Sequence, residues 1–263
     1  MLLDTGVDLH SYQPTVDDII KISDCDIFIY VGGESDAWVS DALGESSKPD
    51  RVVLSLMDLL GDDVKEEELV EGMEAEAEEE EAEEETEYDE HVWLSLRNAR
   101  IFCAAITDAL SALDGDCAEH YAANAAAYDE KLAALDGEFQ ALVQGAAYDT
   151  LLFGDRFPFR YLTDDYGLEY YAAFVGCSAE TEASFETVAF LAEKLSEQSL
   201  PAVLILETGD PALAQTIRDT AGSDAEILTI DSMQGNSAAY TGGYLGVMES
   251  DLSVLKTALG WEG

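Results

Sequence analysis

Basic residues are scarce in this sequence. The 263 residues include 12 Lys and Arg against 57 Asp and Glu, which gives a formal net charge of -45. Nucleic acids and anionic lipid surfaces repel such a protein, because both carry dense negative charge. We therefore expect no nucleic-acid partner, and we expect cations or a basic protein surface to bind instead.

Long hydrophobic runs are also absent. No stretch approaches the roughly 20 apolar residues that cross a bilayer, and no basic segment followed by an apolar one opens the chain. The chain as given is therefore expected to carry no signal peptide. Its four cysteines show no CxxC spacing, which argues against a zinc ribbon or a thioredoxin-like motif. Cys103 and Cys117 are the one pair that is close in sequence. The sequence is compatible both with a disulfide and with separate thiols.

Motifs of common enzymes are missing as well. The sequence has no GxSxG nucleophile elbow, no Walker loop and no GxGxxG after a predicted strand. Only three histidines occur. His10 and His91 lie on loops at predicted element ends, where open α/β sheets bind ligands, whereas His120 is expected on the surface of a long helix.

Hydrophobic residues make up 48% of the chain, and short β-branched runs alternate with helical patterns. This alternation predicts an α/β fold with mostly parallel sheets. Strands are expected at residues 26–31, 51–56, 150–153, 168–175, 202–207 and 226–230. Helices are expected to begin at Thr15, Glu34, Leu94, Ala118, Glu180, Pro211 and Tyr240.

One predicted helix is unusually long. Apolar residues recur at steps of three and four over residues 118–145, which at 1.5 Å per residue gives a helix of roughly 40 Å. We interpret it as a rigid connection between two lobes, with an ordinary crossover helix as the alternative.

A strongly acidic stretch lies in the first half of the chain. Eighteen acidic residues and one lysine occur between Gly61 and Glu90. Adjacent like charges repel and few apolar residues are available to pack, so we expect a disordered loop at about residues 61–88. It is either a solvated charge run or a weak collector of cations.

Several motifs together resemble the zinc- and manganese-binding receptors of ABC transporters. GVDLHSYQPT at residues 6–15 resembles the family's first ligand loop, and DEHVWL at 89–94 is similar to its D-P-H-x-W-L motif. YAANAAAYDEKLAAL at 121–135 resembles the start of the family's interlobe helix, and IDSM at 230–233 resembles the segment with its last carboxylate ligand. The resemblance covers nearly the whole chain.

The resemblance implies an α/β fold of the periplasmic-binding-protein type, with two lobes joined by one long rigid helix. The N-terminal lobe would span residues 1–117, the interlobe helix 118–145 and the C-terminal lobe 146–263. The family normally opens with a strand and a helix before the segment that matches residues 2–10, so the resemblance also implies that this lobe is truncated at its start.

The resemblance implies a metal ion held by four side chains. Its ligands would be His10, His91, Asp155 and Asp231, with Glu207 beside them. An ungapped comparison puts Arg156 at the third ligand position, where a guanidinium cannot ligate. Either Asp155 replaces it through a shift of one residue, or the site has three ligands.

The implied function is that of an extracellular substrate-binding component of an ABC importer, acting as a monomer that passes zinc or manganese to a membrane permease. Two imidazoles and two carboxylates favour manganese, whereas the acidic loop occupies the place of the metal-rich loop of zinc receptors, and zinc stays slightly ahead. A full-length relative would be a lipoprotein or a periplasmic protein. The alternatives are a metal-dependent hydrolase that uses the same histidines, and a cation-buffering or adhesion protein of the cell surface.

Overall fold

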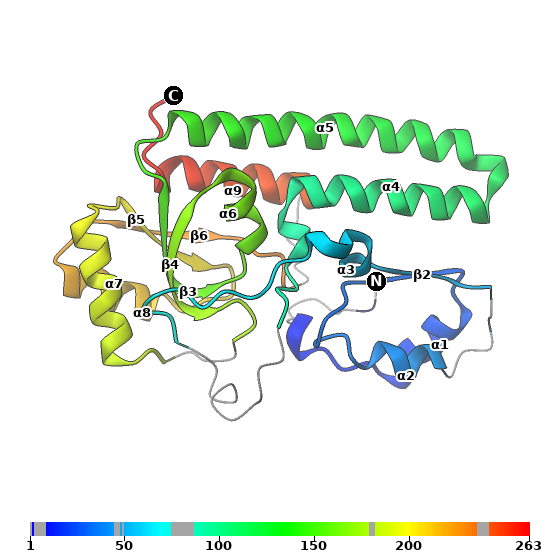
Figure 1. Cartoon of the computed structure of the whole chain (residues 1–263), viewed down its shortest axis with the longest axis horizontal. Coiled ribbons are helices and arrows are strands. Elements are labelled where there is room, and N and C mark those ends of the chain that lie inside the picture. Colours follow the sequence, from blue (N-terminus) through cyan, green and yellow to red (C-terminus); the bar gives the residue numbers. More distant parts are fainter. Residues whose placement is uncertain are drawn as a thin grey trace. The chain divides into compact units, whose positions relative to one another are not determined.

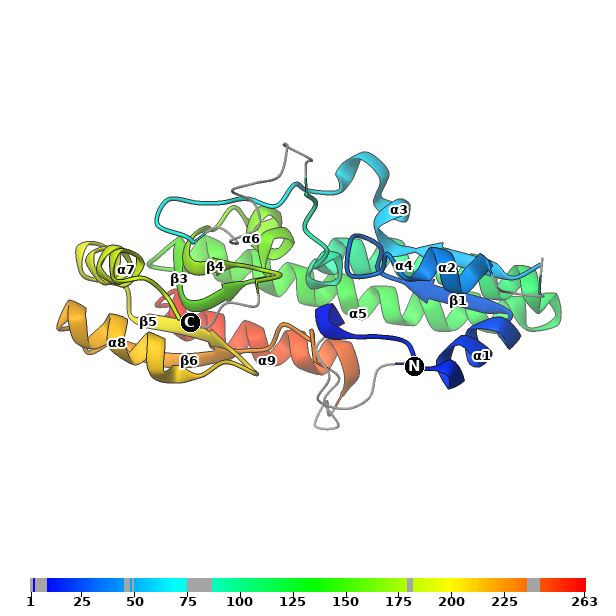
Figure 2. The same cartoon turned by 90° about the horizontal axis from the view of Figure 1, so that it is seen from below.

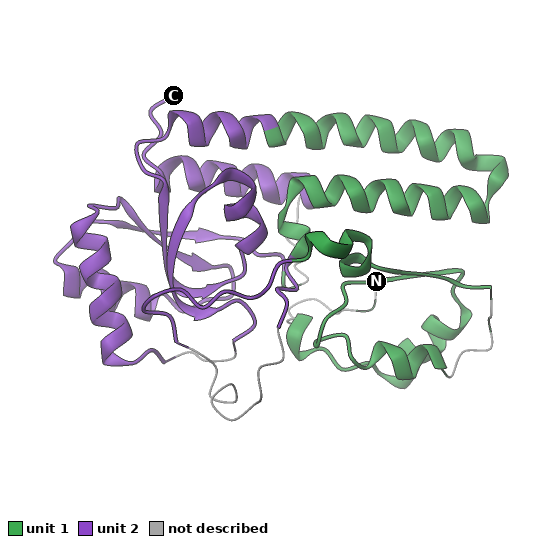
Figure 3. Cartoon of the chain, in the orientation of Figure 1, with its two compact units in different colours: residues 1–64, 92–136, 234–238 green, residues 65–91, 137–233, 239–263 purple. Residues whose placement is uncertain are grey.

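The computed structural model describes residues 2, 9–44, 48, 50–74, 87–178, 182–235 and 242–263. The chain divides into two compact units (Figure 3). Unit 1 comprises residues 1–64, 92–136 and 234–238, and unit 2 comprises residues 65–91, 137–233 and 239–263. No helix among the described residues is both long and apolar enough to cross a bilayer.

Unit 1 contains a two-stranded parallel sheet of β1 (Ile27–Tyr30) and β2 (Val52–Ser55), as predicted (Figure 1). Its helices are α1 (Val16–Asp24), α2 (Val39–Gly44), α3 (Leu56–Leu60) and α4 (Leu96–Leu113). Thr15 and Asp18 form a capping box at the start of α1, where the sequence predicted a helix start. The helix expected from Glu34 begins later, because Asp36 accepts the backbone N–H groups of Val31 and Gly32 and forms a turn first.

Helix α5 spans Ala118–Gly145, the range predicted for the long helix. Its residues up to Asp136 belong to unit 1 and those from Gly137 onward to unit 2. Leu132, Leu135, Phe139 and Leu142 from its predicted apolar stripe are buried. The long helix is thus confirmed. Figure 2 shows it together with α4 from a second direction.

Unit 2 is built on a four-stranded parallel sheet with the order β4-β3-β5-β6. The strands are β3 (Thr150–Phe157), β4 (Glu169–Val175), β5 (Ala202–Leu206) and β6 (Glu226–Ile230). Its helices are α6 (Arg160–Tyr166), α7 (Phe185–Glu197), α8 (Pro211–Ala221) and α9 (Gly243–Ala258). The expected helix starts at Glu180 and Tyr240 lie outside the described residues.

Both faces of this sheet are covered. Val203 and Ile205 pack with Leu191 and Leu195 of α7 and Ile217 of α8 in one apolar cluster. Side chains alternate along a strand, so the remaining buried residues of β5 face the opposite side, where α9 contacts β5 and β6. This burial on both sides explains why β5 is apolar at every position, as parallel strands commonly are.

From Lys65 onward, the described parts of the acidic stretch belong to unit 2 and contact it. Glu74 donates its backbone N–H to the carbonyl of Ala173, and Glu68 pairs with Arg160 at 3.4 Å. Lys65 forms an ion pair of 2.5 Å with Asp164. The sequence favoured a mobile loop in the N-terminal lobe over this range. Residues 75–86, its most acidic part, lie outside the described residues.

Candidate metal centre

His91 is the last residue of segment 65–91, which contains most of the acidic stretch and belongs to unit 2. Its Nδ1 lies 3.0 Å from Oδ1 of Asp89, and the same oxygen accepts the backbone N–H of His91 at 2.8 Å. A carboxylate that holds one ring nitrogen leaves the other as the ligand atom and fixes the orientation of the ring, which is typical of metal-binding histidines. The contact with Asp89 makes Nε2 the candidate ligand atom of His91.

Tyr161 of α6 holds the backbone next to this histidine. Its hydroxyl donates to the backbone oxygen of Asp89 at 2.9 Å and accepts the backbone N–H of Lys65 at 3.0 Å. Burial raises the pKa of Tyr161 well above its usual value, so the hydroxyl stays protonated and keeps donating. Both ends of the 65–91 segment are thus tied to one side chain.

A turn after β4 lies against the ring of His91. Ser178 closes it by donating its N–H to the carbonyl of Val175 at 3.3 Å. A Cβ atom at Gly176 would lie 2.8 Å from Cε1 of His91 and 2.9 Å from the carbonyl of Phe157, so only glycine permits this approach. Cys177 follows, and its Sγ lies within 4.8 Å of a ring nitrogen of His91. Cys177 was not predicted as a site residue, although it lies two residues after the end of a predicted strand.

Asp155, predicted as the third ligand, lies in β3. Its Oδ2 accepts the backbone N–H of Leu206 at 3.0 Å, and its Oδ1 accepts that of Arg156 at 2.8 Å. The register of β3 with β4 shifts between Phe153 and Arg156, and on the β5 side the Asp155 carboxylate accepts the N–H of Leu206 in place of a backbone oxygen. Arg156 extends the other way and donates from Nη1 to the carbonyl of Ser178 at 3.3 Å.

Asp231, predicted as the last ligand, directly follows β6. Its Oδ1 accepts the N–H of Met233 at 2.9 Å, and its own N–H donates to Oδ1 of Asp251 in α9 at 3.0 Å. Glu207 follows β5 and accepts the N–H and the hydroxyl of Ser232 at 2.8 and 2.9 Å. Burial raises the pKa of Glu207, and it raises the pKa of Asp251 to about 8. Three carboxylates thus gather at the carboxyl edge of the sheet, where α/β proteins bind ligands.

His10, predicted as the first ligand, belongs to unit 1, in the short helix η1 (Leu9–Ser11). Its Nδ1 lies 2.8 Å from Oγ of Ser35, and its Nε2 lies 3.0 Å from Nε2 of Gln234. The amide nitrogen of Gln234 donates, so Nε2 of His10 accepts and Nδ1 carries the ring proton. A metal ion that binds Nε2 has to displace this amide. His120, by contrast, is exposed on α5, as expected.

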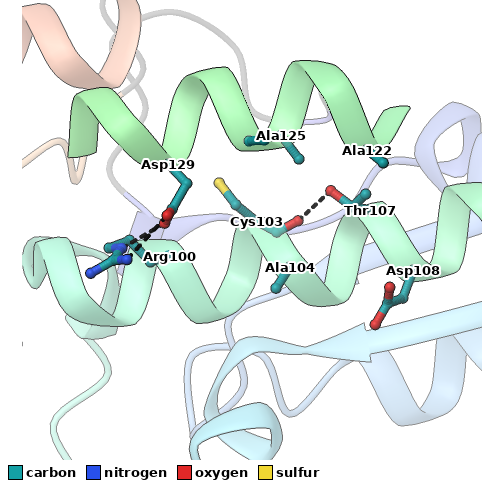
Figure 4. Close-up of a pocket in the computed structure, with 9 residues that line it drawn as sticks. Arg100, Cys103, Ala104, Thr107, Asp108, Ala122, Ala125 and Asp129 are labelled. Atoms are coloured by element: carbon teal, nitrogen blue, oxygen red, sulfur yellow. Dashed lines mark hydrogen bonds and ion pairs between the residues drawn. The ribbon is translucent and has the colours of Figure 1, made fainter. Parts of the chain in front are cut away.

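A groove of about 280 Å³ in unit 1 is a different kind of feature (Figure 4). It lies along α4 and α5, and alanines, Cys103 and the Arg100–Asp129 pair line it. Arg100 donates to both oxygens of Asp129 at 2.5 and 3.0 Å. Burial raises the pKa of the Cys103 thiol, which disfavours the thiolate that a metal needs. This groove therefore lacks the chemistry of a metal centre.

The chain is similar to named zinc-binding and zinc-uptake proteins. It is 31% identical, over 100% of its length, to the zinc-binding lipoprotein AdcA of Streptococcus pneumoniae, and it covers 52% of that protein. It is 29% identical, over 98% of its length, to the high-affinity zinc uptake system protein ZnuA of Bacillus subtilis, of which it covers 80%. The chain thus spans about half the length of the curated AdcA relatives.

Among solved structures, the zinc-bound ZnuA-like domain of Streptococcus pneumoniae AdcA matches with a TM-score of 0.73 and 28% identity. The match covers 98% of this chain and 89% of that domain. The fold predicted from the sequence is thereby confirmed. The family model described as zinc-uptake complex component A, periplasmic, matches residues 1–258. The chain belongs to this ZnuA family.

Proposed function

We propose that this chain is the substrate-binding component of an ABC importer, that it captures a divalent transition-metal ion, and that it passes this ion to a membrane permease. The observation that carries the proposal is the family match over residues 1–258. The geometry of unit 2 supports it, because Asp89 holds His91 as carboxylates hold metal-binding histidines.

The proposed ligands are His10, His91 and Asp231, with Asp155 or no residue in the third position. Glu207 would act indirectly, since its two hydrogen bonds to Ser232 steady the residue next to Asp231. We propose zinc ahead of manganese as the natural ion. Both curated relatives are named for zinc, and the AdcA domain was solved with zinc bound.

The proposed setting is outside the cytoplasmic membrane, where the protein acts as a monomer beside a permease. The AdcA relative is named a lipoprotein, and the family description says periplasmic. We further propose that the chain binds and delivers the ion without catalysing a reaction, since the family is described as a component of an uptake complex.

A deletion separates this proposal from cation buffering by the acidic stretch. Removing residues 75–86 eliminates eight glutamates. It retains Glu68 and Glu74, whose contacts with unit 2 are described above. Calorimetric titration with zinc is expected to give one tight site in the intact chain and in the deletion variant. Loss of the tight site on deletion would instead assign the binding to the acidic stretch and contradict the proposal.

A further inference from the structure

Unit 2 brings a thiol to the candidate metal centre. Sγ of Cys177 and a ring nitrogen of His91 lie within 4.8 Å of each other. A tetrahedral zinc ion with bonds of about 2.3 Å to sulfur and about 2.1 Å to nitrogen holds these two atoms about 3.6 Å apart. The two side chains therefore have to close by at most about an ångström to bind one ion. All four cysteines of the chain are thiols in the structure, so Cys177 is not consumed by a disulfide.

The surroundings position this thiol. Gly176 lets the backbone of the turn pass against the imidazole ring, because a Cβ there would meet Cε1 of His91 at 2.8 Å. On the other side, Arg156 donates to the carbonyl of Ser178. The turn is thus fixed both before and after Cys177.

The hydrogen bond from Arg156 to the carbonyl of Ser178 gives this arginine a structural role. The family resemblance puts a ligand at this position, and a guanidinium cannot supply one. Arg156 instead anchors the turn that carries a potential ligand. Asp155, the alternative ligand, already accepts backbone N–H groups with both oxygens, so a metal ion bound there has to share an oxygen with a hydrogen bond.

We propose that the thiolate of Cys177 is a metal ligand of this chain, beside His91, in the place that the family resemblance leaves to Asp155 or to no residue. The inference rests on the proposed function, since it concerns the same centre. On binding, the S–H bond is broken, a sulfur–metal bond forms and the proton passes to solvent. A thiolate is a soft ligand that suits zinc and disfavours manganese, so Cys177 would bias the centre toward zinc.

Cobalt(II) reports directly on sulfur ligation, because a thiolate–cobalt bond gives an intense near-ultraviolet charge-transfer band. We expect this band when the reduced chain is titrated with cobalt(II). Cys177→Ser should abolish the band and weaken zinc binding at least about 10-fold. Cys103→Ser, a matched change of a half-buried thiol in unit 1, should leave both unchanged.

A second measurement needs no variant. Zinc should slow the alkylation of Cys177 in the wild-type chain, followed by peptide mass spectrometry, and should not slow that of the exposed Cys117. A cobalt complex without the band, together with equal zinc affinity of the wild type and Cys177→Ser, would overturn the inference and leave the proposed function intact. A wild-type chain that binds neither metal would overturn both.

Discussion

Asp251 offers a quantitative test of the electrostatics of unit 2. It lies in α9 with a relative exposure of 1%, and its Oδ1 accepts the N–H of Asp231. Its buried Oδ2 has no hydrogen-bond partner among the described residues. Burial is the main reason that its pKa rises to about 8, and the charges of Asp231 and Glu207 raise it further. We predict that Asp251→Asn makes the metal-free protein less sensitive to alkaline pH.

The sign follows from linkage. An aspartate of the unfolded chain titrates near pH 3.9, so the folded protein binds this proton more tightly than the unfolded chain between about pH 4 and pH 8. The stabilisation is complete below about pH 4 and is lost as the pH rises toward about 8. A pKa difference of about four corresponds to roughly 5.5 kcal/mol, which is the upper limit of the loss.

Asparagine removes this titration and keeps an oxygen for the N–H of Asp231. Its amide hydrogens are buried, however, which should cost about 1–3 kcal/mol at all pH values. We therefore expect Asp251→Asn to be less stable than the wild type at pH 5 and to gain several kcal/mol relative to it by pH 8. Urea denaturation with EDTA at the two pH values measures this gain. Asp219→Asn, at an exposed site of α8, is the control and should show no such gain. A variant that loses stability relative to the wild type as the pH rises would refute the reasoning.

Three further predictions concern packing, capping and the centre itself. Leu191→Ala should lower the free energy of unfolding by about 2–5 kcal/mol in urea denaturation, because Leu191 is fully buried in the α7–α8 cluster, and an unchanged midpoint would contradict this packing. Thr15→Ala removes the cap of α1 and should destabilise that helix by about 1 kcal/mol, seen as faster amide exchange confined to unit 1; unchanged exchange would argue against the cap. Gly176→Ala should weaken zinc binding at least about 10-fold in calorimetry, because the new methyl group meets the ring of His91; wild-type affinity would show that the turn does not press on the ring.

The sequence predicted those elements whose local signals are complete. Residues 226–230 became β6, and the Asp210-Pro211 start of α8 carries a side-chain cap. Helix α6 was missed because its N-cap position is Phe159, which has no capping side chain. Strand β3 runs past its predicted end because Asp155, a residue that reads as a strand breaker, replaces a backbone acceptor for Leu206.

The candidate centre could be proposed from the sequence only in part, for a related reason. His10, His91 and Asp231 stand in motifs that can be read along the chain. The proximity of Cys177 to His91 depends instead on the turn after β4 and on the absence of a side chain at Gly176. Hydrophobic periodicity predicts neither feature. Only the structure relates these two segments.

The most direct test of the account is the stoichiometry of zinc binding to three chains: wild type, His91→Ala and His120→Ala. His120 is an exposed histidine and serves as the matched control. Calorimetry with manganese as competitor should give one tight zinc site in the wild type and in His120→Ala and none in His91→Ala. Weak, multiple binding that is equal in all three chains would contradict the account.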